Sequence, residues 1–420
     1  MLALGAGASP LSAAERGPAT HTVVEGQSFR AIAKRYGVSV EAIALANDLD
    51  LHKPLRIGTV LEIPSPEEAA RILKKGKADA KPGAKKKPGD KNKPGDEGKA
   101  EQAKPAKKAD PRWWLEKPSQ RTQTQKDSKA RGGVHPCLVD DPGFGVFESW
   151  NRAPTMGQAL IPARGGVTKA GSFDLLVHFH GHDPARKEWV KVVDGTVLVG
   201  ITLGIGSGVY SSAFTDPAAF ERLVHSVEVE VARLRGLPKA KVRKLGVSAW
   251  SAGYGAVERI LSQDYGKKAV DTVVLLDGLH SGYRGDGDLE GLQLEPFLAF
   301  AKRAKAGQKL MFLSHSSIIP PGYASTTETA NWLIHQLGGK PKPGKPRKSD
   351  PLGLELNSRY DAGGFHVRGY DGNDKPDHCA HLGLIRDVAK TYLKTRWNSP
   401  RGYGPAPAKN LAQNGGKPKK

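Results

Sequence analysis

The chain has 420 residues, with 64 Lys and Arg against 43 Asp and Glu, which gives a formal net charge of +21 at pH 7. At roughly 150 residues per domain, this length predicts about two or three domains, or one large domain with appendages. The sequence has no run of about 18 apolar residues, so no membrane-spanning helix is predicted. With only 2 cysteines, a disulfide-rich scaffold and a cysteine-rich zinc module are excluded.

Composition divides the chain into five pieces. Residues 1–20 are a small-residue leader, a candidate signal-peptide remnant that lacks the basic start typical of one. The others are a compact patterned block at 21–65, a Lys-, Pro- and Gly-rich linker at 66–132, a large Gly-rich domain at 133–398 and a tail at 399–420. Within the linker, Trp113-Trp114-Leu115 is a candidate docking segment.

Most of the basic excess lies in segments with few apolar residues to bury. Residues 67–112 hold 15 Lys and Arg against 8 Asp and Glu, and the chain ends Gly-Lys-Pro-Lys-Lys. Such segments are predicted to be disordered, and their charge favours loose adhesion to polyanions. Because no base-stacking aromatic pattern accompanies the charge, no specific nucleic-acid partner is predicted.

The block at 21–65 has the pattern of a strand, two helices and a strand. A short strand is predicted at 22–24, Ser28 and Ser39 have the chemistry of helix N-caps, and Gly37 ends the first helix. One face of that helix carries Phe29, Ile32, Ala33 and Tyr36, and the final strand carries Ile57, Val60, Leu61 and Ile63. We therefore expect a small βααβ unit.

This block resembles a LysM domain over its whole length. The resemblance is carried by Gly26, Ser28, Ile32-Ala33, Tyr36-Gly37-Val38-Ser39, Asn47, Leu55, Ile57-Gly58 and Ile63-Pro64. It implies that peptidoglycan, or another glycan containing N-acetylglucosamine, binds in a shallow groove between two loops. By position these loops are Gly26, Gln27, Ser28 and Phe29, and Asp48, Leu49 and Asp50. Gln27 replaces the usual Asp, and the single copy implies weak binding; the alternative is that these residues only shape turns.

In the large domain, apolar runs end in polar or Gly-rich residues. Strands are predicted at 173–179, 196–203, 245–250, 270–276 and 309–313, and helices at 217–234, 256–263 and 295–304. This alternation predicts an α/β fold, a mostly parallel sheet with helices on both faces. In such sheets the active site lies at the carboxyl ends of the strands.

The most informative segment is Ala249-Trp250-Ser251-Ala252-Gly253, where a predicted strand runs directly into a helix. A nucleophilic serine at such a turn needs small neighbours, because the turn is sharp and the backbone is crowded. Ser251 is therefore the candidate nucleophile, and the amide of Ala252 is a candidate oxyanion donor. The alternative is an ordinary tight turn between a strand and a helix.

The large domain resembles the α/β-hydrolase fold over roughly residues 135–397. His180-Gly181 resembles the oxyanion loop of that family, which implies a second donor at Gly181 or His182. The family order of serine, acid and histidine implies an acid after a later strand and a histidine near the C-terminus. Asp277 is the candidate acid, although the family more often places it after the next strand, where Ser314 and His315 stand. Asp277 could instead cap the following turn.

Two histidines compete for the role of base. His378 lies where a polar loop meets an amphipathic helix, and His381 lies one turn further along. We prefer His378, because a loop residue can reach over the sheet, and keep His381 as the alternative. Either one could instead be a structural histidine bonded to a carboxylate.

A metal site is the rival chemistry. His178, His180 and His182 alternate along a predicted strand and so share one face, and Asp183 follows them. This segment resembles the His-x-His-x-Asp-His motif of metallohydrolases, with the last two residues of the motif in inverted order as His182-Asp183. His378 and His381, three positions apart, are further candidate ligands. His178 lies inside the strand, where burial argues against a ligand role.

The two cysteines, Cys137 and Cys379, flank the large domain. In an exported protein they could form a disulfide, and otherwise they are two thiols. The sequence leaves both readings open.

Taken together, these features predict an exported serine hydrolase that is held at the cell wall and cleaves an ester or amide without a cofactor. Ser251, His378 and Asp277 would carry the reaction. One alternative is a glycan-binding protein with a degenerate hydrolase domain, and another is the metallohydrolase.

Overall fold

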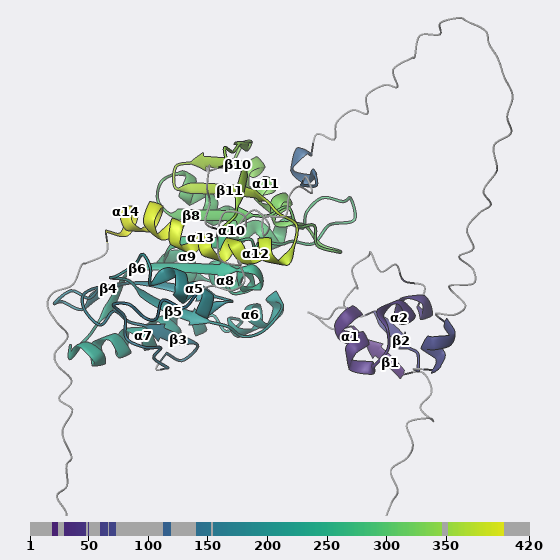
Figure 1. The fold of residues 1–420 in the computed structure, drawn as a ribbon, viewed down its shortest axis with the longest axis horizontal. Coiled ribbons are helices and arrows are strands. Elements are labelled where there is room, and N and C mark those ends of the chain that lie inside the picture. Colours follow the sequence, from purple (N-terminus) through teal and green to yellow (C-terminus); the bar gives the residue numbers. More distant parts are fainter. Residues whose placement is uncertain are drawn as a thin grey trace, which may run out of the picture. The chain divides into compact units, whose positions relative to one another are not determined.

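The computed structural model describes residues 19–23, 29–47, 49, 59–65, 67–72, 112–118, 140–152, 154–346 and 352–398. The chain divides into two compact units between Pro111 and Arg112 (Figure 1). None of the helices in the described ranges is long and apolar enough to cross a membrane.

In the described part of the N-terminal unit, two helices pack with a two-stranded sheet, and a further helical segment at 67–72 follows. Its elements are β1 (Ala19–Thr22), α1 (Phe29–Tyr36), α2 (Val40–Ala46) and β2 (Val60–Ile63). The two strands are antiparallel, and a small core of Val23, Ile32, Ala33, Ile43, Leu61 and Ile63 lies between the elements. The first strand starts earlier than the predicted 22–24, because its backbone pairs with β2 from Ala19 onward.

Polar side chains fix the ends of α2. The Ser39 hydroxyl accepts a hydrogen bond from the Ala42 amide at 3.1 Å, which makes it the predicted N-cap. At the other end, the Asn47 side chain donates to the Ile43 and Glu62 carbonyls and accepts from the Glu62 amide, each at 2.8 Å. Asn47 therefore joins the end of α2 to β2.

The larger unit is built on a nine-stranded sheet with the order β3-β5-β4-β6-β7-β8-β11-β10-β9. The six central strands, from β5 to β11 in this order, are parallel, and the outer strands β3, β10 and β9 are antiparallel. The strands are β3 (Gln158–Leu160), β4 (Ser172–Phe179), β5 (Val197–Ile201), β6 (Lys241–Trp250), β7 (Val270–Leu276), β8 (Leu310–His315), β9 (Lys342–Pro343), β10 (Glu355–Ala362) and β11 (Phe365–Asp371).

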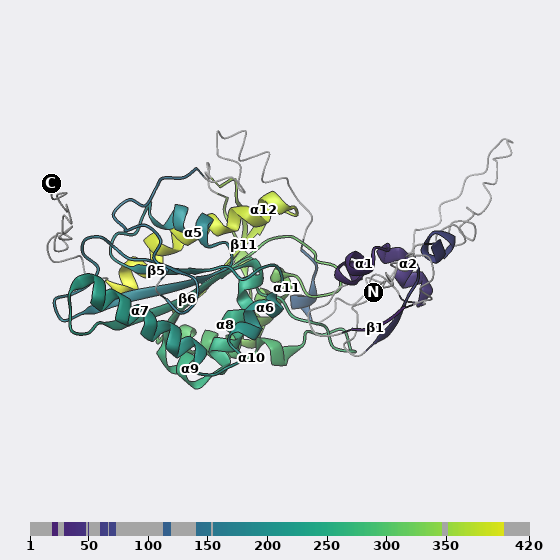
Figure 2. The ribbon, with the colours of Figure 1, turned by 90° about the horizontal axis from the view of Figure 1, so that it is seen from below.

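Helices cover both faces of this sheet. The helices are α5 (His182–Trp189), α6 (Ser207–Ala213), α7 (Ala219–Arg235), α8 (Tyr254–Ser262), α9 (Asp264–Ala269), α10 (Gly291–Lys305), α11 (Thr326–Gln336), α12 (Lys375–Ala380), α13 (Leu384–Val388) and α14 (Lys394–Trp397). Figure 2 shows α5 and α12 on one face and α7 to α10 on the other. Each face has its own apolar core, so the predicted α/β fold class is confirmed.

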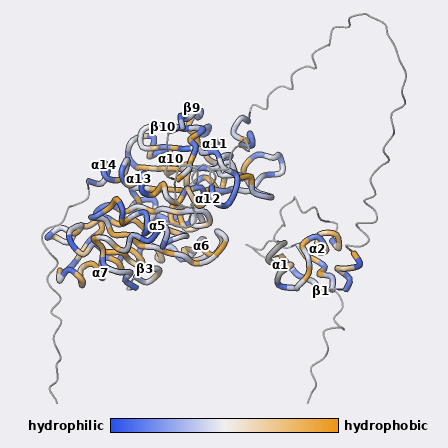
Figure 3. Tube along the Cα trace, viewed as in Figure 1, coloured by the Kyte–Doolittle hydropathy of each residue, from blue (hydrophilic) through white to orange (hydrophobic). Residues whose placement is uncertain are grey.

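The sequence pattern accounts for these layers. All five residues of β5 are apolar or Gly and buried, as expected for a parallel strand covered on both faces. Hydrophobic and hydrophilic residues alternate along α7 in Figure 3, and its buried side chains include Phe220, Leu223 and Val227. A helix with one apolar face is the form that packs on such a sheet.

The hairpin of β10 and β11 is absent from the sequence prediction. Its strands are joined by Gly363-Gly364, and the φ of Gly363 is +58°. A Gly-Gly pair between two β-rich runs is a hairpin signal that could have revealed it. The hairpin extends the sheet beyond β8 and leads the chain into α12.

Two parts of the expected linker at 66–132 have regular structure. Residues 67–72 are helical, with the Ser65 hydroxyl accepting a hydrogen bond from the Glu68 amide. Further along, Trp113–Leu115 form a 3-10 turn that belongs to the larger unit.

Candidate active site

Ser251 stands at a sharp turn where β6 ends. Its φ is +51°, a left-handed conformation that is uncommon for a residue with a side chain and is often found at functional sites. A Cβ at Gly253 would lie 2.3 Å from the Phe179 carbonyl oxygen, and one at Gly278 would lie 2.4 Å from the Ser251 carbonyl oxygen. The crowding explains the small residues around Ser251, and the serine itself remains partly exposed.

His378 and Asp277 form a hydrogen-bonded pair. Their Nδ1 and Oδ2 atoms are 2.7 Å apart, although the residues are 101 positions apart in the chain. An ionised carboxylate can only accept, so Nδ1 of His378 donates and Nε2 is left to accept a proton. Among the described residues no hydrogen bond joins Ser251 to His378. Catalytic hydrogen bonds are often long or poorly aligned without substrate and tighten when it binds.

The carboxyl group of Asp277 is held on its other side as well. It is 1% exposed, and its Oδ1 accepts from the Ser316 amide at 2.8 Å and from the Thr326 hydroxyl at 2.6 Å. Burial opposes ionisation, but the nearby rings of His381 and His378 and the Thr326 bond together lower the pKa of Asp277 well below its usual value. Asp277 is therefore a charged acceptor at neutral pH.

Trp250 lies between two histidines. Its ring stacks on His180, with centroids 5.1 Å apart, and on His378, with centroids 4.8 Å apart. Its indole N–H also donates to the His378 carbonyl at 3.0 Å. The residue before the candidate nucleophile thus contacts both the candidate base and the loop that carries Gly181.

The loop after β4 leaves the sheet beside the Ser251 turn, because β4 and β6 are adjacent parallel strands. His180 and Gly181 have φ values of +70° and +73°. The buried His178 holds this loop, with one ring nitrogen 2.8 Å from the His180 carbonyl and the other 2.6 Å from the Ser248 hydroxyl. The His182 amide already donates to Thr202 at 3.3 Å, which leaves the Gly181 amide as the better oxyanion candidate beside that of Ala252.

His381, the alternative base, has a different environment. It is 0% exposed, and its Nδ1 lies 2.9 Å from the Ser314 hydroxyl at the end of β8. Burial, partly opposed by the charge of Asp277, lowers the pKa of His381 to about 4. The two histidines are thus distinguished by their partners, since His378 is the one bonded to Asp277.

The residues of the rival metal site do not converge. His178 is bonded within the sheet, His182 is 2.8 Å from Thr202, and Asp183 pairs with Arg186 at 2.7 Å. In the part of the chain that the structure describes, no group of three or more His, Cys, Asp or Glu residues is placed to hold a metal ion.

Two further sequence expectations concern the cysteines and the glycan groove. Cys379 is disulfide-bonded, and Cys137, the other cysteine of the chain, lies outside the described residues. Of the predicted glycan contacts, Leu49 is 36% exposed, and Phe29 is the first residue of α1. The remaining contacts lie outside the described residues: Gly26, Gln27, Ser28, Asp48 and Asp50.

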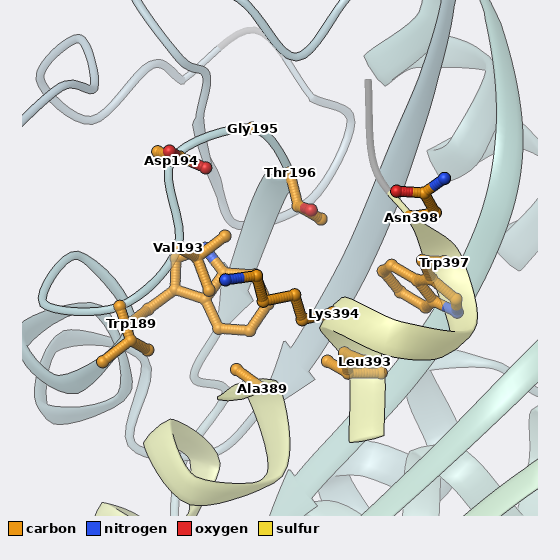
Figure 4. Close-up of a pocket in the computed structure, with 11 residues that line it drawn as sticks. Trp189, Val193, Asp194, Gly195, Thr196, Ala389, Leu393, Lys394, Trp397 and Asn398 are labelled. Atoms are coloured by element: carbon orange, nitrogen blue, oxygen red, sulfur yellow. The ribbon is translucent and has the colours of Figure 1, made fainter. Parts of the chain in front are cut away.

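Two cavities in the described part of this unit lie away from the candidate site. One cavity, of about 270 Å³, lies between residues 189–196 and the segment from Ala389 to Asn398 (Figure 4). Thr196 immediately precedes β5, so this cavity lies at the amino ends of the strands, opposite Ser251. A groove of about 610 Å³ with an apolar lining lies between α8, α9 and α10.

Three residues that contact the candidate site were not predicted from the sequence as site residues: Ser316, Thr326 and Trp250. One signal was available for Thr326. Ser325-Thr-Thr-Glu328 is a capping box, in which each end residue bonds the backbone of the other, and it fixes where α11 begins. The contacts of Ser316 and Trp250 depend on tertiary packing and leave no local pattern.

Comparison with known proteins bears first on the N-terminal unit. The LysM domain family matches residues 21–64, so this part of the chain is a LysM domain, as predicted. No curated protein matches the chain.

Solved structures resemble the larger unit only distantly. An uncharacterised protein from Capnocytophaga ochracea has a TM-score of 0.34 at 11% identity, over 58% of this chain and 61% of its own. An acylaminoacyl peptidase from Pyrococcus horikoshii has a TM-score of 0.34 at 14% identity, over 64% and 45%. The siderophore hydrolase EstB from Aspergillus nidulans has a TM-score of 0.31 at 12% identity, over 60% and 95%. TM-scores below 0.5 are too low to show the function of this unit.

Proposed function

We propose that this protein is a serine hydrolase that cleaves an ester or amide and is brought to peptidoglycan-type glycans by its LysM domain. The observation that carries the proposal is the 2.7 Å bond between His378 and Asp277 at the same sheet edge as the strained Ser251. A serine becomes nucleophilic when a neutral imidazole, oriented by a carboxylate, can take its proton.

The residues have the following roles. The Ser251 oxygen attacks the substrate carbonyl carbon while its proton passes to Nε2 of His378, and Asp277 stabilises the imidazolium that forms. The amides of Ala252 and Gly181 donate to the oxyanion. His378 then gives its proton to the leaving group, and water hydrolyses the acyl-serine by the same steps in reverse order.

Labelling with a fluorophosphonate probe tests the activated serine. We expect the wild-type chain to be labelled, Ser251→Ala to be unlabelled, and the matched control Ser262→Ala, at the other end of α8, to be labelled like wild type. A folded wild-type protein that stays unlabelled would overturn the serine mechanism and favour a degenerate hydrolase domain. Loss of hydrolysis with a chelator, with activity retained in Ser251→Ala, would instead favour the metallohydrolase.

The LysM domain supports the targeting half of the proposal, because this family binds glycans that contain N-acetylglucosamine and is typical of exported, wall-associated proteins. Tethering would raise the local substrate concentration without a new catalytic contact. We expect the full chain to sediment with insoluble peptidoglycan. Ile43→Asp places a charge in the core of the N-terminal unit, where Ile43 is 0% exposed, and should abolish sedimentation while fluorophosphonate labelling persists.

A further inference from the structure

The segment Arg112–Pro118 has linker composition but packs on the larger unit. Trp114 is 9% exposed, and its ring stacks on His335 of α11, with centroids 3.9 Å apart. Its indole N–H donates to Asp288 Oδ1 at 3.1 Å. Residues Arg112–Pro118, although they lie within the expected linker at 66–132, are therefore docked on the larger unit.

Lys117 at the end of this segment pairs with a buried carboxylate. Its ammonium lies 2.7 Å from Glu328 Oε1, and the side chains are 49% and 1% exposed respectively. Lys117 also contacts Tyr283, whose hydroxyl donates to the same carboxylate oxygen at 2.8 Å. Among the described residues Lys117 is the only cation paired with Glu328. A buried carboxylate is costly without such a partner.

Glu328 belongs to the turn that holds the candidate acid. Its other carboxylate oxygen accepts from the Ser325 amide and hydroxyl, at 2.8 and 2.7 Å, and so closes the capping box of α11. In the same turn, the Thr326 hydroxyl donates to Asp277 Oδ1 at 2.6 Å. The next residue, Thr327, donates to the Ser316 carbonyl at 2.7 Å, and the Ser316 amide is the second donor to Asp277.

We propose that Arg112–Pro118 is a strap that positions the catalytic acid, with Lys117 acting through Glu328 and the first turn of α11 on Asp277. This proposal rests on the proposed function for its catalytic consequence. A part of the expected linker then supports the active site, so a change at the strap reaches the catalytic acid without touching substrate.

Lys117→Met in the full chain tests the strap. We expect its rate of fluorophosphonate labelling to fall by about tenfold, because a 1 Å displacement at a site can cost up to about 100-fold. Lys117→Arg keeps the charge and should restore most of the rate. The matched control is Arg243→Met, which also removes the cation from a buried carboxylate, Asp174, but at the amino ends of the strands. At temperatures where this variant is folded, its labelling rate should stay within about twofold of the wild-type rate.

Backbone hydrogen exchange over residues 314–328 gives a second readout that needs no activity. We expect Lys117→Met to speed exchange there and Arg243→Met to leave it unchanged. Equal labelling rates in the two variants, or unchanged exchange in Lys117→Met, would overturn the strap. An unlabelled wild type would overturn the proposed function instead, and the exchange comparison would still decide whether the strap supports this turn.

Discussion

Strand β7 has an aspartate near each end, and the two have opposite surroundings. Asp271, at the amino end, accepts from the guanidinium of Arg396 at 2.8 and 2.9 Å and from the Trp397 indole at 2.9 Å. Asp277, just past the carboxyl end, has a φ of +45° and is bonded to a histidine, a hydroxyl and an amide. A strong cation at Asp271 anchors the C-terminal helix to the sheet, whereas an imidazole at Asp277 can gain and lose a proton.

Backbone strain follows the same division. Four non-glycine residues in the described ranges have positive φ, and three of them end neighbouring strands at the carboxyl edge: His180, Ser251 and Asp277. Such conformations cost about 1–3 kcal/mol each and persist where the surrounding structure enforces them. On the proposed function, the strained carboxyl edge carries the chemistry, whereas the amino edge carries structural ion pairs such as Arg396–Asp271.

Asp277→Asn should have the largest effect on activity. An amide in place of the carboxylate can hold the wrong tautomer of His378, and the equivalent change in a serine protease lowers turnover by about 10⁴-fold. Kinetics on an activated ester, normalised to the concentration of folded protein, would measure it. A loss below tenfold would mean that Asp277 is not the acid of this site.

Stability should fall in mild acid because of buried neutral histidines at the carboxyl edge. Burial lowers the pKa of His381 to about 4, and burial likewise lowers that of His315 to about 4. An unfolded histidine titrates near pH 6.5, so below that pH the unfolded chain binds protons that the folded chain does not. The contribution of each histidine is fully present above pH 6.5 and is lost as the pH falls toward 4, by about 3 kcal/mol at most.

Urea unfolding at pH 7 and pH 4.5 would test this expectation. His381→Asn keeps an acceptor near Ser314 but removes the titrating ring, so it should flatten the dependence of stability on pH. His225→Gln, at an exposed position of α7, is the control and should leave the slope as in wild type. An unchanged slope in His381→Asn would contradict the assignment of His381 as a buried neutral residue.

Asp271→Asn should have the opposite effect to Asp277→Asn, because it should lower stability and leave activity unchanged. It leaves Arg396 without its carboxylate, so we expect the free energy of unfolding to fall by about 2–3 kcal/mol. Breaking a fully buried ion pair costs about 3–5 kcal/mol, and the loss here is expected to be smaller. The loss is smaller because this pair is not fully buried: the side chain of Asp271 is 13% exposed and that of Arg396 is 23% exposed. Thermal unfolding would show the loss, while activity per folded molecule at low temperature should match wild type. A large loss of activity would break the distinction between the two edges.

The sequence predicted more of the sheet and the reacting groups than of their support. Continuous apolar runs located β4 to β8, and polar residues at their ends marked Ser251 and Asp277 as candidates. The preference for His378 over His381 rested on loop position, and three residues of separation could not reveal that only one ring is bonded to Asp277. Contacts such as Thr326 on Asp277, or Lys117 on Glu328 across 211 positions, arise from packing between distant segments and have no local signature.

The smallest effect concerns Trp250, whose ring and indole N–H can be separated by mutation. Trp250→Phe keeps an aromatic face against His180 and His378 but loses the 3.0 Å bond to the His378 carbonyl. A net hydrogen bond is worth about 1 kcal/mol, so we expect a loss of about fivefold in kcat/KM. Trp250→Leu also removes the stacking on the imidazolium and should cost several-fold more. If the two variants were equally impaired, the stacking would contribute nothing, and Trp250 would act on His378 through its hydrogen bond alone.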